Sequence, residues 1–98
     1  MKRPSSAARE AAEMLAIQAL AFIAEEPQRL NGFLTVTGLT LERLRESASA
    51  PGFLAGVLDH MLADESLLVA FADSAAIDPA DVARARSALG GRWERDVP

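Results

Sequence analysis

The sequence predicts an all-α fold, a compact bundle of five to six short helices. Alanine supplies 20 of the 98 residues and aromatic residues are rare, so the core must come mainly from leucine and alanine on closely approaching helices. Apolar residues recur every three or four positions through most of the chain. Residues that begin or end helices separate these stretches at short intervals.

The first expected helix is capped by Ser5 or Ser6 and runs to about Glu25. The alanine-rich stretch after the cap has a high intrinsic preference for helix. Between positions 14 and 24 every residue except Gln18 is apolar, which leaves no broad polar face. We therefore expect this helix at the centre of the bundle.

Two short helices should follow. Pro27 suits the first position of a second helix, because its missing N–H group has no partner there in any case. Gly38 ends that helix, since glycine readily adopts the left-handed conformation. Thr40 then caps a third helix that carries Leu41, Leu44 and Ala48.

Pro51 marks the next break, and the clearest amphipathic helix of the chain follows it. Its apolar stripe consists of Phe53, Leu54, Val57, Leu58, Met61 and Leu62. Asp59 and His60 fall on the other side of this helix.

Two further helices complete the prediction. Asp64 caps a fifth helix with Leu67, Leu68, Phe71 and Ala75 inside. Asp78 caps a sixth, with Pro79 in its first turn and Asp81 complementing its positive end. Gly90 and Gly91 stop this helix after Leu89. The whole chain, 1–98, is expected to form a single domain with an ordered core over about 6–90 and a flexible tail at 91–98.

A shift of the chain by 38 residues brings similar positions into register. Leu30 then meets Leu68, Phe33 meets Phe71, and the cap Thr40 meets the cap Asp78. We therefore predict two copies of one three-helix unit, related by a pseudo-twofold axis.

Several classes of protein are disfavoured. The chain has no cysteine, which excludes disulfides and cysteine-ligated metals, and it has no calcium-binding D-x-D-x-D-G loop. Glu10, Glu13 and Gln18 argue against a secretory signal near the N-terminus, and the apolar run there is shorter than the about 20 residues that span a bilayer. We expect a soluble, cytoplasmic protein without metal or cofactor and without contact to a membrane.

The charge is unevenly distributed. The net charge is −4, yet residues 46–83 carry seven carboxylates and no Lys or Arg. Such a segment repels nucleic acid, whose partners usually present a basic face. The ordinary interpretation is a solvated outer surface, and the functional one is a docking face for a basic partner.

His60 is the only histidine and therefore the first candidate for catalysis. Asp59 beside it and Asp64 one turn on could orient the imidazole. Adjacent residues on a helix do not face each other, however, and no second converging group or nucleophile is recognisable. An ordinary, partly exposed histidine is favoured, and the protein is not expected to be an enzyme.

Two connections resemble the turn of a DNA-binding helix-turn-helix, one at 37–40 and one at 75–78. The helices after them would have to supply the contacts to bases. That function requires Arg43, Arg45, Arg84 or Arg86 to gather on one face. Short turns between helices are common in helical proteins, so a plain structural connection is favoured.

Trp93 is an isolated large aromatic residue after the Gly90-Gly91 pair. Two interpretations stay open. Trp93 folds back onto the bundle and covers an apolar gap, or it anchors a partner, because Trp and Arg are enriched at the energetic centres of interfaces.

A family resemblance rests on several strings together. They are LAIQALAFIA at 15–24, Pro27, Leu30, Phe33-Leu34, Thr37-Gly38-Leu39, Phe53-Leu54, Val57-Leu58-Asp59, Leu62-Ala63-Asp64-Glu65 and Asp78-Pro79. Over about residues 10–90 the chain resembles a bacterial family known only as domain of unknown function number 3572. The resemblance implies a short all-helical bacterial protein without an assigned activity or site. Ala76 stands where the analogy with Gly38 leads us to expect glycine.

We therefore expect an interaction or regulatory module that binds a protein partner, with a basic partner as the best fit. The candidate partner-binding residues are Asp59, His60, Asp64, Glu65, Asp73 and Trp93. The alternatives are a helix-turn-helix-like DNA-binding regulator and an enzyme of unrecognised type centred on His60. Both a monomer and a homodimer are open, because Met61, Leu62 and Leu67 add apolar surface to a small core.

Overall fold

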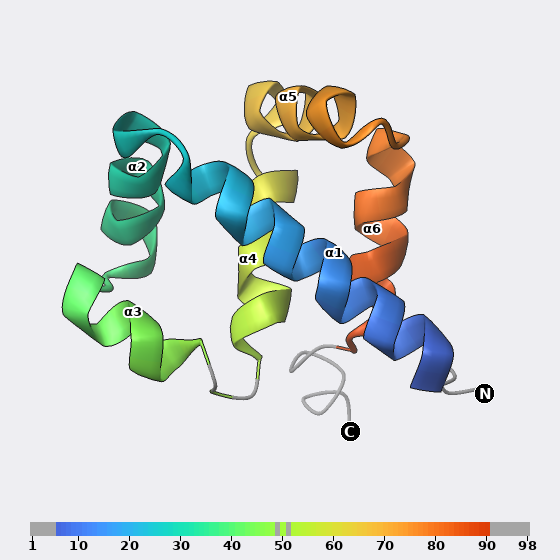
Figure 1. Ribbon diagram of the computed structural model, residues 1–98, viewed down its shortest axis with the longest axis horizontal. Helices are drawn as coiled ribbons and strands as arrows, with labels where there is room; N and C mark the ends of the chain where they lie inside the picture. Colours follow the sequence, from blue (N-terminus) through green and yellow to red (C-terminus); the bar gives the residue numbers. More distant parts are fainter. Residues whose placement is uncertain (1–5, 49, 51, 91–98) are drawn as a thin grey trace.

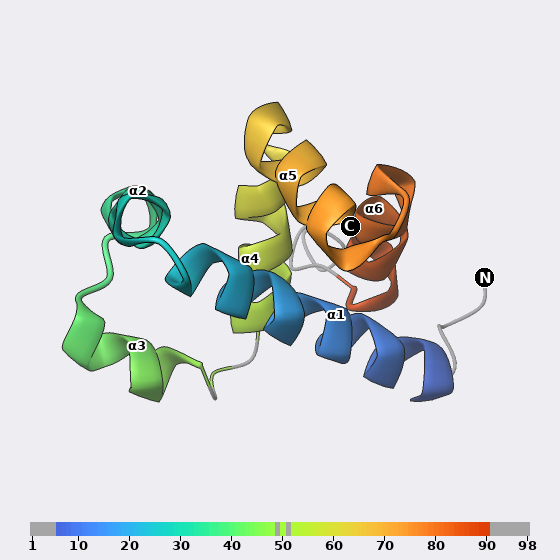
Figure 2. The same cartoon turned by 45° about the horizontal axis from the view of Figure 1, so that its top comes forward.

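A long central helix crosses the molecule, and shorter helices gather around it (Figures 1 and 2). The structure is a computed structural model that describes residues 6–48, 50 and 52–90. In chain order its helices are α1 (Ser6–Ala24), α2 (Pro27–Thr37), α3 (Leu41–Ser47), α4 (Phe53–Leu62), α5 (Glu65–Ala75) and α6 (Pro79–Ala88). The described residues form no strand, and the prediction of an all-α bundle is confirmed.

The helix boundaries follow the local chemistry predicted for them. Gly38 adopts the left-handed conformation with φ 75°, and its N–H donates to the carbonyl oxygen of Leu34. The Thr40 hydroxyl accepts a hydrogen bond from the backbone N–H of Arg43, which caps α3. Short-range signals of this kind need no help from the rest of the fold, which is why they can be read from the sequence.

The last two helices are capped as well. The carboxylate of Asp64 accepts a hydrogen bond from the N–H of Leu67 at the start of α5. At the start of α6, Asp78 accepts from the N–H of Ala80, and the Asp81 side chain accepts from the N–H of Asp78 in a reciprocal capping box. Both predicted caps are confirmed.

The helix boundaries also repeat at the predicted offset of 38 residues. α2 and α5 begin and end 38 positions apart, α3 and α6 begin 38 positions apart, and α1 and α4 end 38 positions apart. The packing differs between the halves, because α6 packs against both α1 and α4, whereas α3 makes few contacts with any other described helix. The duplication of a three-helix unit stays a prediction.

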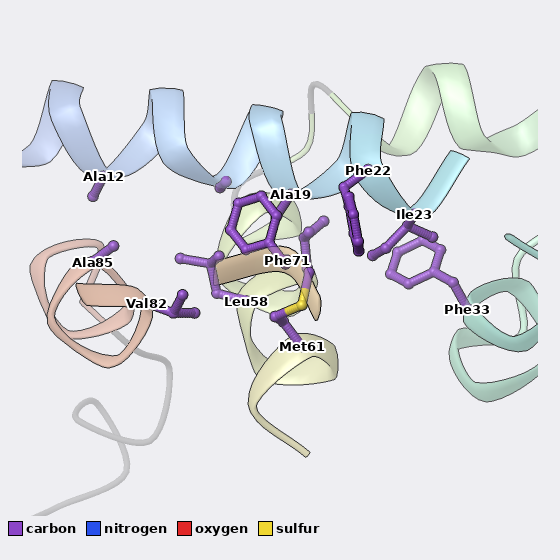
Figure 3. Packing of buried hydrophobic residues seen from close by; sticks show 12 residues of the cluster. Ala12, Ala19, Phe22, Ile23, Phe33, Leu58, Met61, Phe71, Val82 and Ala85 are labelled. Atoms are coloured by element: carbon purple, nitrogen blue, oxygen red, sulfur yellow. The ribbon is translucent and has the colours of Figure 1, made fainter. Parts of the chain in front are cut away.

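The core combines small alanines with phenylalanines and with the fully buried aliphatic residues Ile23, Val57, Leu58, Met61 and Val82 (Figure 3). Ala12, Ala16 and Ala19 lie on one face of α1 and are buried against α4 and α6, where their small side chains allow close approach. Phe33 of α2 and Phe71 of α5 are almost fully buried. The core was expected to come mainly from leucine and alanine; Leu58 is the only fully buried leucine among the described residues, and the other leucines of the core cluster are partly buried around its centre.

The position of α1 agrees with the prediction of a central helix, because it packs against α2, α4 and α6. One side of it still faces solvent, with Met14 64% and Ile17 55% exposed. None of the described helices has both the length and the apolar character needed to cross a membrane.

The residues that suggested a homodimer are covered within one chain. Met61 is fully buried, and Leu62 and Leu67 are half-buried against the core. Most of their apolar surface is therefore used in folding, and the choice between monomer and homodimer stays a prediction. The predicted flexible tail lies outside the described residues.

Candidate interaction surface

The candidate partner-binding residues are spread over α4, α5 and the C-terminal segment. Asp59 on α4 is held by Arg86 on α6, with 2.6 Å between Arg86 Nε and Asp59 Oδ1. The Arg86 side chain is only 13% exposed, and its Nη1 also donates to the carbonyl oxygen of Gly90. Asp59 therefore joins two helices of its own chain, and it is not a free carboxylate for a partner.

His60 lies against Phe33 and is half-buried. The two ring centroids are 5.1 Å apart and the planes stand at 85°, an edge-to-face arrangement. The expectation that His60 points away from the apolar side of α4 was therefore wrong. Its neighbour on the sequence, Asp59, is turned toward α6 instead.

The residues around His60 give no further support to catalysis. Phe33 also packs against Phe53, with ring centroids 6.3 Å apart, so His60 borders a small aromatic group. Within residues 6–48, 50 and 52–90, no three His, Asp or Glu side chains gather in a way that could hold a metal ion. The arrangement places His60 in a packing role.

Three of the candidate carboxylates belong to α5 or its cap. Asp64 is occupied as the cap, whereas Glu65 and Asp73 lie on the exposed side of the helix. Val69 stands between them in sequence and is 51% exposed. Because residues four apart on a helix are neighbours, Glu65, Val69 and Asp73 form one outer stripe, which we call the α5 stripe.

The α5 stripe lies at the edge of the molecule. In Figure 1, α5 runs along the top; it packs mainly against α4 and α6, and its Phe71 also contacts Phe22 of α1, with ring centroids 5.5 Å apart. Its inner side is buried through Phe71 and Ala72, and its outer side is polar apart from Val69 and Ala70. Within the described part of the chain, neither Glu65 nor Asp73 pairs with a basic side chain.

The arginines that a DNA-binding protein would need do not gather. Arg43 and Arg45 belong to α3, at the opposite end of the molecule from α6 in both Figures 1 and 2. On α6, Arg84 pairs with Asp81 and Arg86 pairs with Asp59. Their charge is thus divided between two ends and partly neutralised.

Two neighbouring hollows lie on either side of the connection between α3 and α4. One, of about 290 Å³, is mostly apolar and is lined by Phe33, Thr37, Leu39, Ser47, Ala50, Gly52, Phe53 and Gly56. The other, of about 310 Å³, is lined by Arg9, Glu13, Ala48, Ala50, Gly52, Leu54, Ala55 and Leu89. Neither hollow could be predicted from the sequence, because the lining residues of each come from three or four separate elements.

Trp93, the last candidate, lies outside the described residues. Arg86 was overlooked as an anchoring residue, since its partners Asp59 and Gly90 are brought to it only by the packing of α6 on α4. The sequence shows an arginine in the last turn of a helix, but it does not show that this arginine is partly buried, because α6 is short and rich in alanine.

These features define a small all-α protein with an acidic outer helix and two shallow hollows beside its third connection. Comparison with known families extends this description. The chain belongs to the family described as "Protein of unknown function (DUF3572)", whose match covers residues 9–92, and the resemblance noted in the sequence is confirmed. No curated protein and no solved structure matches the chain.

Proposed function

We propose that the protein is a cytoplasmic interaction module that docks a basic segment of a partner protein on the α5 stripe. The single observation that carries the proposal is the spacing of Glu65, Val69 and Asp73 on the exposed side of α5. Two carboxylates flank one half-exposed apolar side chain there. A segment with one apolar residue between two Lys or Arg residues complements this arrangement.

The charge of the surrounding chain supports the same choice. Residues 46–83 contain no Lys or Arg, so few neighbours of α5 compete for its carboxylates. The basic side chain of Arg86 reaches into this region, where it forms an ion pair with Asp59. Long-range attraction of a basic partner would speed its association and weaken as salt screens the charges.

Of the six residues first considered, two carry the proposal. Glu65 and Asp73 face outward, whereas Asp59 and Asp64 serve the fold and His60 packs on Phe33. The protein acts as a monomer in this proposal, with neither metal nor cofactor and without enzymatic activity. Neither the enzyme centred on His60 nor the DNA-binding regulator gains support from the geometry described above.

The proposal is tested by reversing the two charges. Tagged protein is recovered from its native cells with its partners, beside a Glu65→Lys/Asp73→Lys variant. The matched control is Glu42→Lys/Glu10→Lys, which changes the net charge equally on exposed sites of α3 and α1, with Glu42 in the first turn of its helix as Glu65 is. Circular dichroism first establishes that both variants fold.

A partner recovered with the parent and the control, and lost with the α5 variant, is the expected result. Binding of that partner, measured by titration with the purified proteins, should weaken as salt rises. Equal recovery by the parent and the α5 variant would refute docking on α5. Equal loss in both variants would mean that the partner senses net charge alone, which also contradicts the proposed site.

A further inference from the structure

The outer side of α1 is apolar over its whole second half. The exposed residues from Met14 to the end of the helix are Met14, Ile17, Gln18, Ala21 and Ala24, and Gln18 alone among them is polar. All charged residues of α1 precede Met14, and two of them, Arg9 and Glu13, pair with each other. A helix face in contact with water normally carries polar and charged groups, so this face lacks the composition of a solvated surface.

Other exposed apolar residues of the described chain lie apart from one another. Val36, Leu41 and Val69 belong to three different helices, α2, α3 and α5. Single apolar side chains of this kind are common on protein surfaces. Met14 and Ile17 differ, because residues three apart lie on the same side of a helix and here form one continuous apolar surface.

This face of α1 is open. The buried side chains of α1, such as Ala12, Ala19 and Ile23, point toward the other helices in Figure 3. In Figure 1, α1 passes in front of α4, and none of the described helices passes in front of α1. The apolar outer side is therefore accessible to a second molecule.

Four residues on this face follow the spacing of a helix that packs along another helix. Met14, Ile17, Ala21 and Ala24 are separated by three, four and three positions, as the a and d positions of a heptad repeat are. We call these four residues the outer seam. Its two large side chains come first along the helix, and its two small ones follow.

The order of large and small residues makes the outer seam complementary to itself. When two copies of α1 run antiparallel, with a twofold axis beside Ala19, Met14 lies opposite Ala24 of the other copy and Ile17 lies opposite Ala21. A large side chain then faces a small one at every position, which allows dense packing. A parallel pair in register would set Met14 against Met14 and Ala24 against Ala24, and it would leave gaps at the alanines.

Gln18 fits the same arrangement. It is exposed beside the outer seam and one position from the axis, so its two copies are offset by only about 3 Å along the helices. A glutamine amide group both donates and accepts hydrogen bonds, and the two side chains can therefore bond to each other at the edge of the contact.

We propose that two copies of the chain associate through the outer seam of α1 in an antiparallel, twofold-symmetric dimer. Burial of Met14 and Ile17 supplies the driving force, and the second copy is the occupant whose shape the seam matches. This contact is separate from docking on the α5 stripe, which uses another helix and needs only one copy of the chain.

Sedimentation over a wide range of protein concentrations tests the dimer. We expect the parent to pass from monomer to dimer as its concentration rises. Added salt should not weaken the dimer, because salt screens charges and the contact is apolar. A parent that stays monomeric at every concentration, or that dissociates as salt is added, would overturn the proposal.

Two matched variants locate the contact. Ile17 and Val36 are both exposed aliphatic residues within helices, 55% and 73% exposed, but Val36 lies on α2 and outside the outer seam. Ile17→Lys should be monomeric at concentrations where the parent is dimeric, whereas Val36→Lys should dimerise as the parent does. Circular dichroism verifies that both variants fold. Equal behaviour of the two variants would exclude the outer seam as the contact.

Cross-linking tests the orientation without disturbing the seam at Ile17, since the chain has no cysteine of its own. A short bifunctional maleimide should join two copies of Gln18→Cys. It should not join two copies of Ala24→Cys, because these residues lie about 15 Å apart along the antiparallel helices. Equal cross-linking of both variants would indicate a parallel pair, and cross-linking of neither would place the contact elsewhere. Each of these results contradicts the proposed dimer.

Discussion

The guanidinium group of Arg29 lies 4.0 Å above the ring of Phe22, and its Nη1 atom donates a hydrogen bond to the carbonyl oxygen of Phe22 at 3.1 Å. Phe22 stands in the last turn of α1, where carbonyl groups lack partners further along the helix. Arg29 stands in the first turn of α2. One side chain thus joins the end of α1 to the start of α2 and stabilises the corner between them.

Replacement of Arg29 by alanine should lower the free energy of unfolding by about 1–2 kcal/mol, since it removes a cation–π contact and a charge-assisted hydrogen bond. Urea denaturation followed by circular dichroism measures the loss. Arg84→Ala is the control, because Arg84 is 70% exposed and, among the described residues, its ion pair is with Asp81 on its own helix. We expect the control to change stability by less than about 0.5 kcal/mol. An equally small effect of Arg29→Ala would contradict the role of this corner.

The pair of Asp59 and Arg86 should behave as a structural link between α4 and α6. Asp59→Asn should cost about 1 kcal/mol, and Arg86→Ala somewhat more, because Arg86 is mostly buried and also holds Gly90. The double variant should lose less than the sum of the two single losses, which a double-mutant cycle measures.

The carboxylate of Asp73 provides the comparison for that cycle. It lies on the exposed side of α5, so Asp73→Asn should leave the free energy of unfolding within about 0.5 kcal/mol of the parent. Additive losses for Asp59 and Arg86, or an equal loss at Asp73, would mean that the ion pair does not stabilise the fold.

Local chemistry explains which parts of this fold were predictable. Thr40, Asp64 and Asp78 cap helices through hydrogen bonds to residues two or three positions away, so their role is written in the adjacent sequence. Asp59 and Arg86 are 27 positions apart, and nothing near either residue indicates the other. His60 and Phe33 are also far apart in the sequence, and their contact, which places His60 in a packing role, could not be predicted from the residues near either one.

Burial was less predictable than helix boundaries. Met61 was expected to add to an apolar surface, yet it is fully buried because α1 and α4 cross at close range over small alanines. Leu41 carries the same apolar signal in the sequence and is 62% exposed, since α3 packs closely against no other described helix. Periodicity shows which face of a helix is apolar, but the packing partner decides whether that face is covered.

The weak attachment of α3 predicts local unfolding there. No residue of α3 (Leu41–Ser47) is fully buried, and the apolar residue Leu44 is only half-buried. Hydrogen exchange followed by mass spectrometry should show rapid exchange in α3 and slow exchange in α4, which contributes Val57, Leu58 and Met61 to the core. Thr40→Ala, which removes the cap, should speed exchange in α3 and leave α4 unchanged. Equal protection of the two helices would contradict this assignment.

Ala76 offers the sharpest test of backbone strain. It ends α5 in left-handed conformation with φ 59°, the role that glycine fills at Gly38 with φ 75°. In that conformation the Cβ atom of an L residue crowds the following carbonyl oxygen, and glycine avoids the crowding. Ala76→Gly should therefore raise the free energy of unfolding by about 0.5–1 kcal/mol, although glycine also gives the unfolded chain more freedom.

The reverse change at the first turn should have the opposite sign. Gly38→Ala should lower the free energy of unfolding by about 1 kcal/mol, because open space surrounds the position and strain in the backbone alone opposes the added Cβ. Ala63→Gly is the control, since Ala63 ends α4 in right-handed conformation with φ −80°, where glycine only adds freedom to the unfolded chain and should destabilise. Thermal unfolding of the three variants gives the signs directly. A loss of stability in Ala76→Gly as large as in Ala63→Gly would mean that the left-handed turn after α5 carries no strain for glycine to relieve.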